Sequence, residues 1–279
     1  MMAIVKMKKH TPLVSVVIVT KNEEKNIGNC LESIKGQDYL KDRIEIIVVD
    51  NASTDHTKEI AKKYTKFVFN KGPERSAQRN YGLYKAKGEY LLYLDADMTL
   101  SKNVISECVK KVSAHPEIIG LYISEIVTGN SFWSKVRRFE RSFYDATVVD
   151  CVRFVKATDF RAVKGFDTSM TGPEDWDFDK KIRLRGKVSL VKQPIYHNEA
   201  EFNFKKYLSK KGYYAKSFDV YIKKWGRGDA DVRKQFSPLY RYFEVFVENG
   251  RWTKIVRNPG LSIGVLMLRF LVGLIYLLS

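Results

Sequence analysis

Two continuous apolar runs near the N-terminus constrain the fold more than any other feature of this sequence. Residues 15–20 read SVVIVT and residues 44–50 read IEIIVVD, and both runs are rich in β-branched side chains. Unbroken runs of this kind are typical of strands buried on both faces of a parallel sheet. Between them, Ile27, Leu31 and Ile34 recur at helical spacing. The pattern predicts an α/β domain with a Rossmann-like, mostly parallel central sheet flanked by helices.

Two further strands are predicted in the next fifty residues. A short strand over 66–69 precedes a helix over 76–86, and YLLYL at 90–94 is a fourth buried strand. In open α/β sheets, ligands bind beyond the carboxyl ends of the strands. Polar residues follow three of these strands, and we expect them to line one rim: Thr20, Asn22, Glu23, Asp50, Asp95 and Asp97.

The triplet Asp95-Ala96-Asp97 is the most specific chemical feature of the sequence. Two carboxylates at the end of a buried strand are costly unless a positive charge compensates them. A divalent cation that bridges a diphosphate does so, and its preferred ligands are oxygens. The triplet therefore predicts a Mg²⁺ or Mn²⁺ site. The alternative is a pair of solvated loop aspartates, which Asp50 at the end of the neighbouring strand makes less favourable.

The second half of the chain is basic and rich in aromatic residues. The whole sequence has 49 Lys and Arg against 32 Asp and Glu, a net charge of +17, and this excess predicts anionic partners. Aromatic and basic side chains alternate through residues 130–145 and 201–225. Stretches of this kind lie in the headgroup layer of membranes and attract anionic lipid. We expect interfacial helices over 201–258.

Residues 259–279 form an apolar segment that is just long enough to cross a bilayer. Arg269 near its middle costs about 2.5–3.5 kcal/mol on insertion scales, which the apolar side chains roughly offset. The prediction is a C-terminal membrane helix, with a buried core helix as the alternative. Basic residues just before it favour a location at the cell membrane with the preceding domain facing the cytoplasm: Arg251, Lys254 and Arg257.

Four motifs occur in a fixed order between residues 13 and 190. They read SVVIVTKNEEKNI, IIVVDNASTDHT, RSAQRNYGLYKAKGEYLLYLDAD and GFDTSMTGPEDWDFDKKIRLRGKV. In this order they resemble the family 2 glycosyltransferases, which have the GT-A fold, and among them dolichyl-phosphate-mannosyltransferase-like and minimal cellulose-synthase-like membrane enzymes. The resemblance implies a GT-A catalytic domain over 1–200, with a nucleotide-sugar half at about 13–100 and an acceptor half at about 101–200.

The resemblance also implies roles for the donor residues. Asp97 corresponds to the principal metal ligand, with Asp95 near the ribose or the metal, and Asp50 to the residue that binds the nucleobase. Two arginines are positioned to meet the base or the diphosphate, although Arg79 equally fits a salt bridge beneath the loop. The residues that the resemblance assigns to donor binding are Thr20, Asn22, Glu23, Asp50, Arg75, Arg79, Asp95 and Asp97.

The dipeptide Glu174-Asp175 matches the position of the catalytic base in the family. The resemblance gives Asp175 the role of accepting a proton from the attacking hydroxyl, with Glu174 orienting the acceptor or the base. The alternative is an acidic cluster that caps a helix. His197 either completes the metal or diphosphate site or is a structural histidine. Trp225 and Trp176 are candidates for the acceptor side.

Together these expectations describe an inverting, metal-dependent transferase at the membrane. The donor is a nucleotide diphosphate hexose, with GDP-mannose favoured and a UDP-sugar second. The acceptor is lipid-linked, a dolichyl or polyprenyl phosphate or a diphosphate glycan. The alternatives are a UDP-sugar-dependent transferase for a polysaccharide or glycolipid and, in another class, a non-catalytic module that binds nucleic acid or membrane. Nucleic acid is not an expected partner, because phosphates would be repelled by the carboxylate rim.

Overall fold

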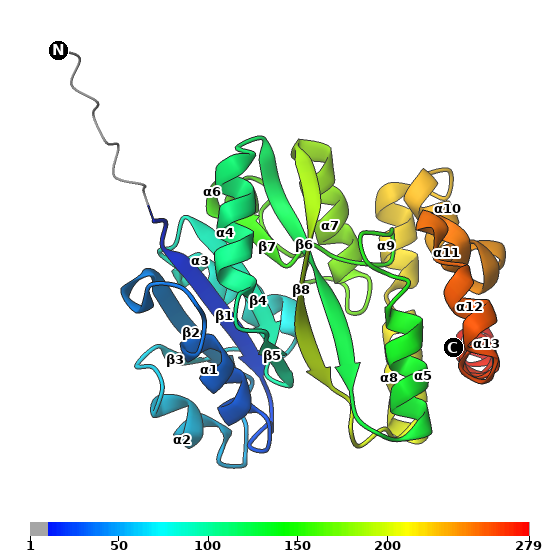
Figure 1. The fold of residues 1–279 in the computed structure, drawn as a ribbon, viewed down its shortest axis with the longest axis horizontal. Helices are drawn as coiled ribbons and strands as arrows, with labels where there is room; N and C mark the ends of the chain where they lie inside the picture. Colours follow the sequence, from blue (N-terminus) through cyan, green and yellow to red (C-terminus); the bar gives the residue numbers. More distant parts are fainter. Residues whose placement is uncertain (1–10, 279) are drawn as a thin grey trace.

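A single mixed sheet of eight strands forms the centre of the molecule (Figure 1). The computed structural model describes residues 11–278; residues 1–10 and Ser279, which the predicted catalytic domain and C-terminal helix include, lie outside the described residues. The strand order is β3-β2-β1-β4-β7-β6-β8-β5. The strands are β1 Val14–Thr20, β2 Ile44–Asp50, β3 Val68–Asn70, β4 Tyr90–Asp95, β5 Met98–Leu100, β6 Ile118–Thr128, β7 Phe154–Lys156 and β8 Lys187–Asn198.

The prediction of an α/β sheet is confirmed, and its first half is parallel throughout. Strands β1, β2, β3 and β4 pair only in parallel with one another. The second half is mixed, because β7 runs antiparallel to both β4 and β6, and β5 runs antiparallel to β8. Both β5 and β7 have three residues, which is too short for a hydrophobic run to reveal them or their direction.

Helices cover both faces of the sheet, and the alternating side chains of β1 divide between two cores. Val16 and Ile18 pack with α1 Ile27–Lys35, α2 Thr57–Lys62 and α4 Val104–Ala114, whereas Val17 packs toward the other face. The alternation follows from the two-residue period of a strand. The second face is covered by α3 Arg75–Lys85, α6 Ala157–Ala162 and α7 Glu174–Arg185.

The register of the central strands brings their carboxyl ends to one edge. Thr20 pairs with Asp50 across β1 and β2, and Val19 pairs with Asp95 across β1 and β4. The polar residues that follow these strands therefore start from neighbouring points on the same rim, as the sequence predicts.

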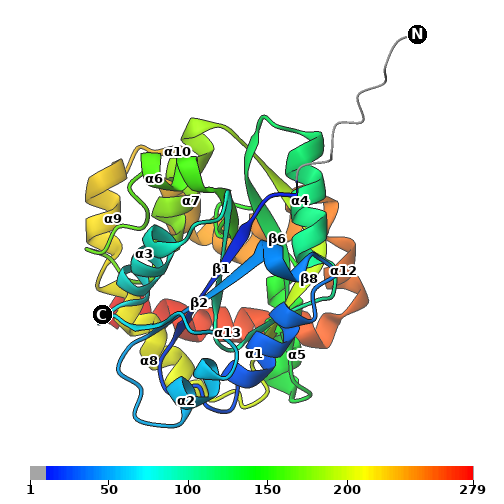
Figure 2. The same ribbon diagram turned by 90° about the vertical axis from the view of Figure 1, so that its left-hand side faces the viewer.

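The remaining helices gather beside the β6 and β8 end of the sheet (Figure 1). Figure 2 shows α13 crossing the molecule alongside α5 and α8, against both of which it packs. Val136, Phe143, Phe246 and Leu268 form the core between them. The elements are α5 Phe132–Arg141, α8 Phe204–Ala215, α9 Phe218–Trp225, α10 Ala230–Phe236, the π-helical turn η2 Tyr240–Glu244, α11 Val245–Val247, α12 Thr253–Arg257 and α13 Pro259–Leu278, with the 3₁₀ turns η1 Lys41–Arg43 and η3 Glu248–Gly250.

Helix α13 is long and apolar enough to cross a membrane, yet one side of it is packed against α5 and α8. Arg269 is 6% exposed. Its Nε donates to Glu140 Oε1 at 3.0 Å and its Nη2 donates to the Tyr144 hydroxyl at 2.6 Å. Burial alone would raise the pKa of Glu140, but Arg137 and Arg269 hold it well below its usual range. One side of α13 is thus buried in the protein, as the core-helix alternative expects, and the other side is exposed.

The substitution Arg269→Met tests this packing. Breaking a buried ion pair costs about 3–5 kcal/mol when one charge stays unpaired, and Glu140 retains Arg137 as a second partner. We expect the free energy of unfolding in urea to fall by about 2–3 kcal/mol. Met267 on the opposite side of α13 is 53% exposed, so Met267→Gln changes it by about 0.5 kcal/mol or less. Equal effects of the two variants would contradict the packed arrangement.

Candidate functional site

A cavity of about 1180 Å³ opens beside the carboxyl ends of β1 and β4. It extends from this rim past the start of α7 to α8 and α13. Eight of the predicted site residues line it: Thr20, Glu23, Arg75, Asp95, Asp97, Asp175, Trp176 and His197. The other five are not in its wall: Asn22, Asp50, Arg79, Glu174 and Trp225.

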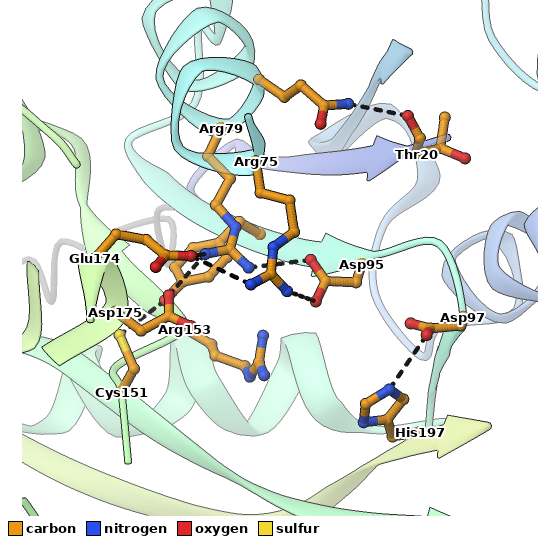
Figure 3. Close-up of polar contacts among 12 residues, drawn as sticks. Thr20, Arg75, Arg79, Asp95, Asp97, Cys151, Arg153, Glu174, Asp175 and His197 are labelled. Carbon is orange, nitrogen blue, oxygen red and sulfur yellow. Dashed lines mark hydrogen bonds and ion pairs between the residues drawn. The ribbon is translucent and has the colours of Figure 1, made fainter. Parts of the chain in front are cut away.

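The two aspartates of the triplet point to different partners (Figure 3). Asp95 faces α3, where Arg79 Nη2 lies 3.0 Å and Arg75 Nη1 3.7 Å from its carboxylate oxygens. Asp97 faces β8, where His197 Nε2 lies 3.2 Å from Oδ2. Burial alone would raise the pKa of Asp95, but Arg79 and Arg75 hold it well below its usual range. Asp95 is therefore ionised and already compensated by protein charges.

Arg79 connects Asp95 on the rim of the sheet to Asp175 on the opposite side of the cavity. Its side chain is 1% exposed, and its Nη1 donates to Asp175 Oδ1 at 2.7 Å while Nη2 donates to Asp95 Oδ1 at 3.0 Å. The guanidinium lies over the rings of Tyr93 and Phe166 at 4.9 and 5.3 Å from their centroids. Of the two roles that the sequence analysis allows for Arg79, contact with the ligand or a salt bridge beneath the loop, this geometry is that of the salt bridge.

The start of α7 holds one buried and one accessible carboxylate. The side chain of Glu174 is 1% exposed and accepts from Arg75 Nη2 at 3.3 Å and from the backbone N–H of Gly172. Burial and the neighbouring Asp175 raise the pKa of Glu174. The side chain of Asp175 is 30% exposed and lines the cavity. Asp175 is thus the carboxylate of this dipeptide that a ligand can reach.

Asp50 and Asn22 hold the loops of the rim. The carboxylate of Asp50 accepts from the backbone N–H of Ser53 at 2.8 Å and from its hydroxyl at 2.5 Å. Asn22 has a positive φ of 54°, and its Oδ1 accepts from the Thr54 N–H at 2.9 Å. Neither of these two predicted donor residues lines the cavity, since Asp50 is buried and Asn22 is exposed beside it in the sheet rim loops, and both hold the shape of these loops.

The site fits a divalent cation that shares its ligands with a phosphate group. Asp97 Oδ1 and Thr20 Oγ1 are buried polar atoms with no hydrogen-bond partner in the described chain. Within residues 11–278, no group of three or more His, Cys, Asp or Glu side chains is arranged to hold a metal. Mg²⁺ is commonly bound by one or two carboxylates together with substrate phosphates and water. Asp97 Oδ1 suits such a shared site.

His197 belongs to a charged network that the sequence did not predict. Its Nδ1 lies 2.9 Å from Glu125 Oε1, and Glu125 Oε2 also accepts from Arg141 at 3.2 Å and Arg153 at 3.0 Å. Burial lowers the pKa of His197, but the hydrogen bonds to Asp97 and Glu125 raise it to about 10. Both ring nitrogens of His197 thus face carboxylates, and one of these belongs to Asp97, the predicted metal ligand. Glu125 lies within an apolar stretch of the sequence, and a buried carboxylate needs a partner. This position could therefore have indicated a buried charged network.

The two tryptophans predicted for the acceptor side have different positions. Trp176 lines the cavity and packs on Phe218, with 6.2 Å between ring centroids. Trp225 instead donates from Nε1 to Asp177 Oδ1 at 2.9 Å, and Lys180 Nζ lies 4.6 Å from the centre of its ring. The structure gives Trp225 a packing position outside the cavity wall, because its indole N–H satisfies a buried carboxylate of α7.

Comparison with known proteins identifies the family. The sequence model described as Glycosyl transferase family 2 matches residues 15–165, which is more than half of the chain. The protein belongs to the family 2 glycosyltransferases. The matched segment contains the rim, the triplet and α3, whereas Asp175 and the helices after β8 lie beyond it.

Curated relatives of this family 2 glycosyltransferase match it over part of their length. Glycosyltransferase AglE of Haloferax volcanii is 34% identical over 37% of the chain and 36% of that protein. A poly(ribitol-phosphate) β-N-acetylglucosaminyltransferase, TarS of Staphylococcus aureus, is 34% identical over 36% of the chain and 19% of that protein. A dolichyl N-acetyl-α-D-glucosaminyl phosphate 3-β-D-2,3-diacetamido-2,3-dideoxy-β-D-glucuronosyltransferase of Methanococcus voltae is 26% identical over 62% of each chain.

Solved structures show that the fold is shared over nearly the whole chain. A mannosyltransferase of Pyrobaculum calidifontis in complex with GDP-Man and Mn²⁺ has a TM-score of 0.61 at 19% identity and covers 95% of this chain and 86% of its own. S. aureus TarS 1–349 in complex with UDP-GlcNAc has a TM-score of 0.56 at 19% identity and covers 93% and 81%. The predicted GT-A fold is confirmed.

Arg79→Gln tests the bridge between Asp95 and Asp175. We expect the free energy of unfolding at neutral pH to fall by about 3–5 kcal/mol, because two carboxylates lose a buried cation. Arg79 lowers the pKa of Asp95, so this stabilisation is present above the unfolded pKa of aspartate, about 3.9. Without Arg79, burial raises the pKa of Asp95 in the folded state, so this carboxyl binds a proton at a higher pH than in the unsubstituted protein. The difference between the two proteins should therefore shrink as pH falls from about 8 to about 4, measured by urea unfolding. A difference independent of pH would contradict the bridge.

Proposed function

We propose that this protein transfers a hexose from a nucleotide diphosphate sugar to a lipid-linked acceptor at the cytoplasmic face of the cell membrane. The observation that carries the proposal is the cavity itself. Asp95 and Asp97 line it at the sheet edge and Asp175 lines it at the start of α7, with Arg79 joining the two sides. One wall thus suits a nucleotide and a cation, and the other presents a carboxylate for proton transfer.

The donor rim suits a diphosphate and a divalent cation. Asp97 would hold Mg²⁺ or Mn²⁺ through its unpartnered Oδ1, and the bound cation supplies charge neutralisation for the leaving nucleoside diphosphate. Asp95 is compensated by Arg79 and Arg75, so it is available as a hydrogen-bond acceptor for the ribose. Thr20 and Glu23 extend this rim toward the base.

Asp175 is the proposed general base. Its carboxylate accepts the proton of the acceptor hydroxyl as that oxygen attacks C1 of the sugar and the C1–O bond to the diphosphate breaks. A single displacement inverts the anomeric centre. Arg79 fixes the position of Asp175 Oδ1, and Glu174 holds Arg75 near the same point. These contacts orient the base before the acceptor arrives.

Mannose from GDP-mannose is the favoured donor, and a UDP-sugar is the second candidate. Support for the first is the shared fold of the P. calidifontis mannosyltransferase, whose structure contains GDP-Man and Mn²⁺. Support for the second is TarS, whose structure contains UDP-GlcNAc. Turnover of a panel of GDP- and UDP-sugars with a membrane lipid extract separates these donors.

The pair Asp97→Asn and Asp175→Asn separates donor binding from proton transfer. We expect Asp97→Asn to lose the Mn²⁺-dependent part of GDP or UDP affinity, because the amide is a poorer cation ligand. We expect Asp175→Asn to keep that affinity and to lower the transfer rate by about 10²–10⁴-fold. Calorimetric titration of the nucleotide with and without Mn²⁺, together with product formation, measures both effects.

Asp219→Asn is the matched control, because Asp219 is exposed on α9 and outside the cavity. It should leave both measurements unchanged. Full transfer activity in Asp175→Asn would refute the assignment of the base, and nucleotide affinity that is insensitive to Mn²⁺ in the unsubstituted protein would refute the cation site.

An apolar face on α13 supports the membrane part of the proposal. Its side chains are 40–84% exposed at helical spacing, and neighbouring segments extend the surface. Because Leu268 and Arg269 on the other side are buried in the protein, α13 would lie in the plane of the interface with one side in lipid. The apolar face consists of Ile263, Leu266, Met267, Phe270, Leu274 and Leu277, together with Trp252 and Val256.

Vesicle binding tests the apolar face. We expect the protein to sediment with vesicles of phosphatidylglycerol and phosphatidylcholine. We expect Leu266→Gln/Met267→Gln to bind about 30-fold more weakly or worse, since two apolar side chains at about 1–2 kcal/mol each contribute about 2–4 kcal/mol together. The control Leu40→Gln/Leu184→Gln removes two exposed leucines that lie outside α13, one in a loop and one on α7. This variant should bind the vesicles as the unsubstituted protein does. Equal binding by both double variants would contradict the proposal, and self-association without vesicle binding would assign the face to a second copy of the chain.

A further inference from the structure

One part of the cavity wall comes from helices that carry none of the proposed donor residues, and it adjoins the donor rim, because the Tyr214 hydroxyl of α8 accepts from Arg75 Nη2 at 2.7 Å. We call it the rear chamber; α5, α8, η2 and α13 form its wall. Four cations in this wall form no ion pair with any residue in the range 11–278: Lys206, which lies near Glu23 of the rim, and Lys210, Lys211 and Arg241. Lys211 and Arg241 are half-buried and Lys210 is exposed. Cations without carboxylate partners create a favourable position for an anion.

Positive charge exceeds negative charge around this chamber. Among the lining residues of its four elements, Glu140 is the one carboxylate, and it is already shared by Arg137 and Arg269. Arg269 is 6% exposed, lines the same cavity, and leaves Nη1 without a hydrogen-bond partner in the described chain. An unpartnered buried guanidinium nitrogen is costly unless a ligand meets it.

Lys211 experiences this positive environment most strongly. Its ammonium lies 5.2 Å from the ring centre of Tyr207 and 5.9 Å from that of Tyr214. Burial lowers the pKa of Lys211 to about 7, and Arg137, Arg241 and Lys210 add to the effect against the opposing charge of Glu140. A bound anion would relieve the repulsion and restore the proton.

The chamber also has an apolar side that reaches the surface. Phe270, Leu274 and Leu277 of α13 line the cavity and are 59%, 40% and 84% exposed. They belong to the apolar face defined above, so the chamber opens where that face would meet lipid. A ligand that fits both sides has an anionic head and a hydrocarbon chain.

We propose that Lys210, Lys211 and Arg241 bind the phosphate of a lipid-linked acceptor, and that its hydrocarbon chain leaves the chamber past Phe270 and Leu277. This inference rests on the proposed function, because it places the acceptor so that its reacting group meets Asp175. It assigns acceptor recognition to the helices after β8, which lie outside the segment matched by the family.

Titration of the full chain with farnesyl phosphate tests the subsite directly. We expect measurable binding, and we expect Lys211→Met and Arg241→Met each to weaken it by about tenfold, the effect of losing one charge-assisted hydrogen bond. Lys216 is exposed at the end of α8 and is not in the cavity wall, so Lys216→Met is the matched control and should bind normally. Unchanged affinity in both cavity variants would overturn the proposal.

Two further ligands separate the head from the chain. Farnesol should bind much more weakly than farnesyl phosphate, and its affinity should be the same in all variants. Equal affinity for farnesol would overturn the phosphate role. Inorganic phosphate should also bind more weakly, and affinity equal to that of farnesyl phosphate would overturn the lipid role and assign the cations to free phosphate.

Nucleotide binding distinguishes failure of this subsite from failure of the proposed function. The cavity variants should bind GDP or UDP with Mn²⁺ as the unsubstituted protein does. If they lose nucleotide but keep farnesyl phosphate, the cations belong to the donor site and the subsite is refuted. If the unsubstituted protein binds farnesyl phosphate but no nucleotide, the donor proposal fails and the subsite stands.

The pH dependence gives a readout that lost packing would not reproduce. Lys211 faces Arg137 and Glu140 on α5, Arg241 on η2 and Lys210 on its own helix. Between about pH 6 and about pH 8.5 the free protein loses the Lys211 charge, since its pKa is about 7. The ratio of the affinities of unsubstituted protein and Lys211→Met should therefore shrink as pH rises. A constant ratio would overturn the role of Lys211.

Discussion

The buried guanidinium of Arg79 is the interaction on which the arrangement of the site depends. It holds Asp95 at the end of β4 and Asp175 at the start of α7, two carboxylates 80 residues apart in the sequence. Burial alone would raise the pKa of Asp95, and Arg79 is the largest influence that holds it well below its usual range. One arginine thus keeps the donor rim and the proposed base at a fixed separation, and the cavity between them stays open.

A second buried arginine, Arg269, fixes the position of the C-terminal helix α13. Arg269 ties α13 to α5 through Glu140 and Tyr144. The helix is apolar enough for a membrane span, but this pairing turns one side of it inward and leaves the opposite side exposed. The proposed acceptor chamber lies between this helix and the site. Packing of α13 therefore determines both where the protein would meet the membrane and how an acceptor would approach Asp175.

The sequence predicted the parts of the fold that depend on local pattern. The strands at 15–20, 44–50 and 90–94 are long, apolar and β-branched or aromatic, and the structure has all three within one or two residues. Their parallel order then placed Asp95 and Asp97 on one rim without any further information. The chain belongs to the family that the ordered motifs resemble.

Features that depend on distant contacts were not predictable in the same way. Periodicity does not show that the Asp50 carboxylate accepts two hydrogen bonds from Ser53, or that His197 lies between Asp97 and Glu125. Each of these pairings is set by tertiary packing. For the same reason Trp225 could not be told from an acceptor platform until its bond to Asp177 was visible. The sequence does indicate that Arg269 has a partner, since a charge within an apolar helix requires one. It does not show that this partner is Glu140.

The most direct test of the donor site is an anomalous scattering map from crystals grown with Mn²⁺ and GDP or UDP. The proposed site predicts one strong manganese peak next to Asp97, shared with the nucleotide phosphates, in the cavity that Asp175 lines. Nucleotide bound in that cavity without manganese beside Asp97, or nucleotide bound elsewhere on the molecule, would contradict it.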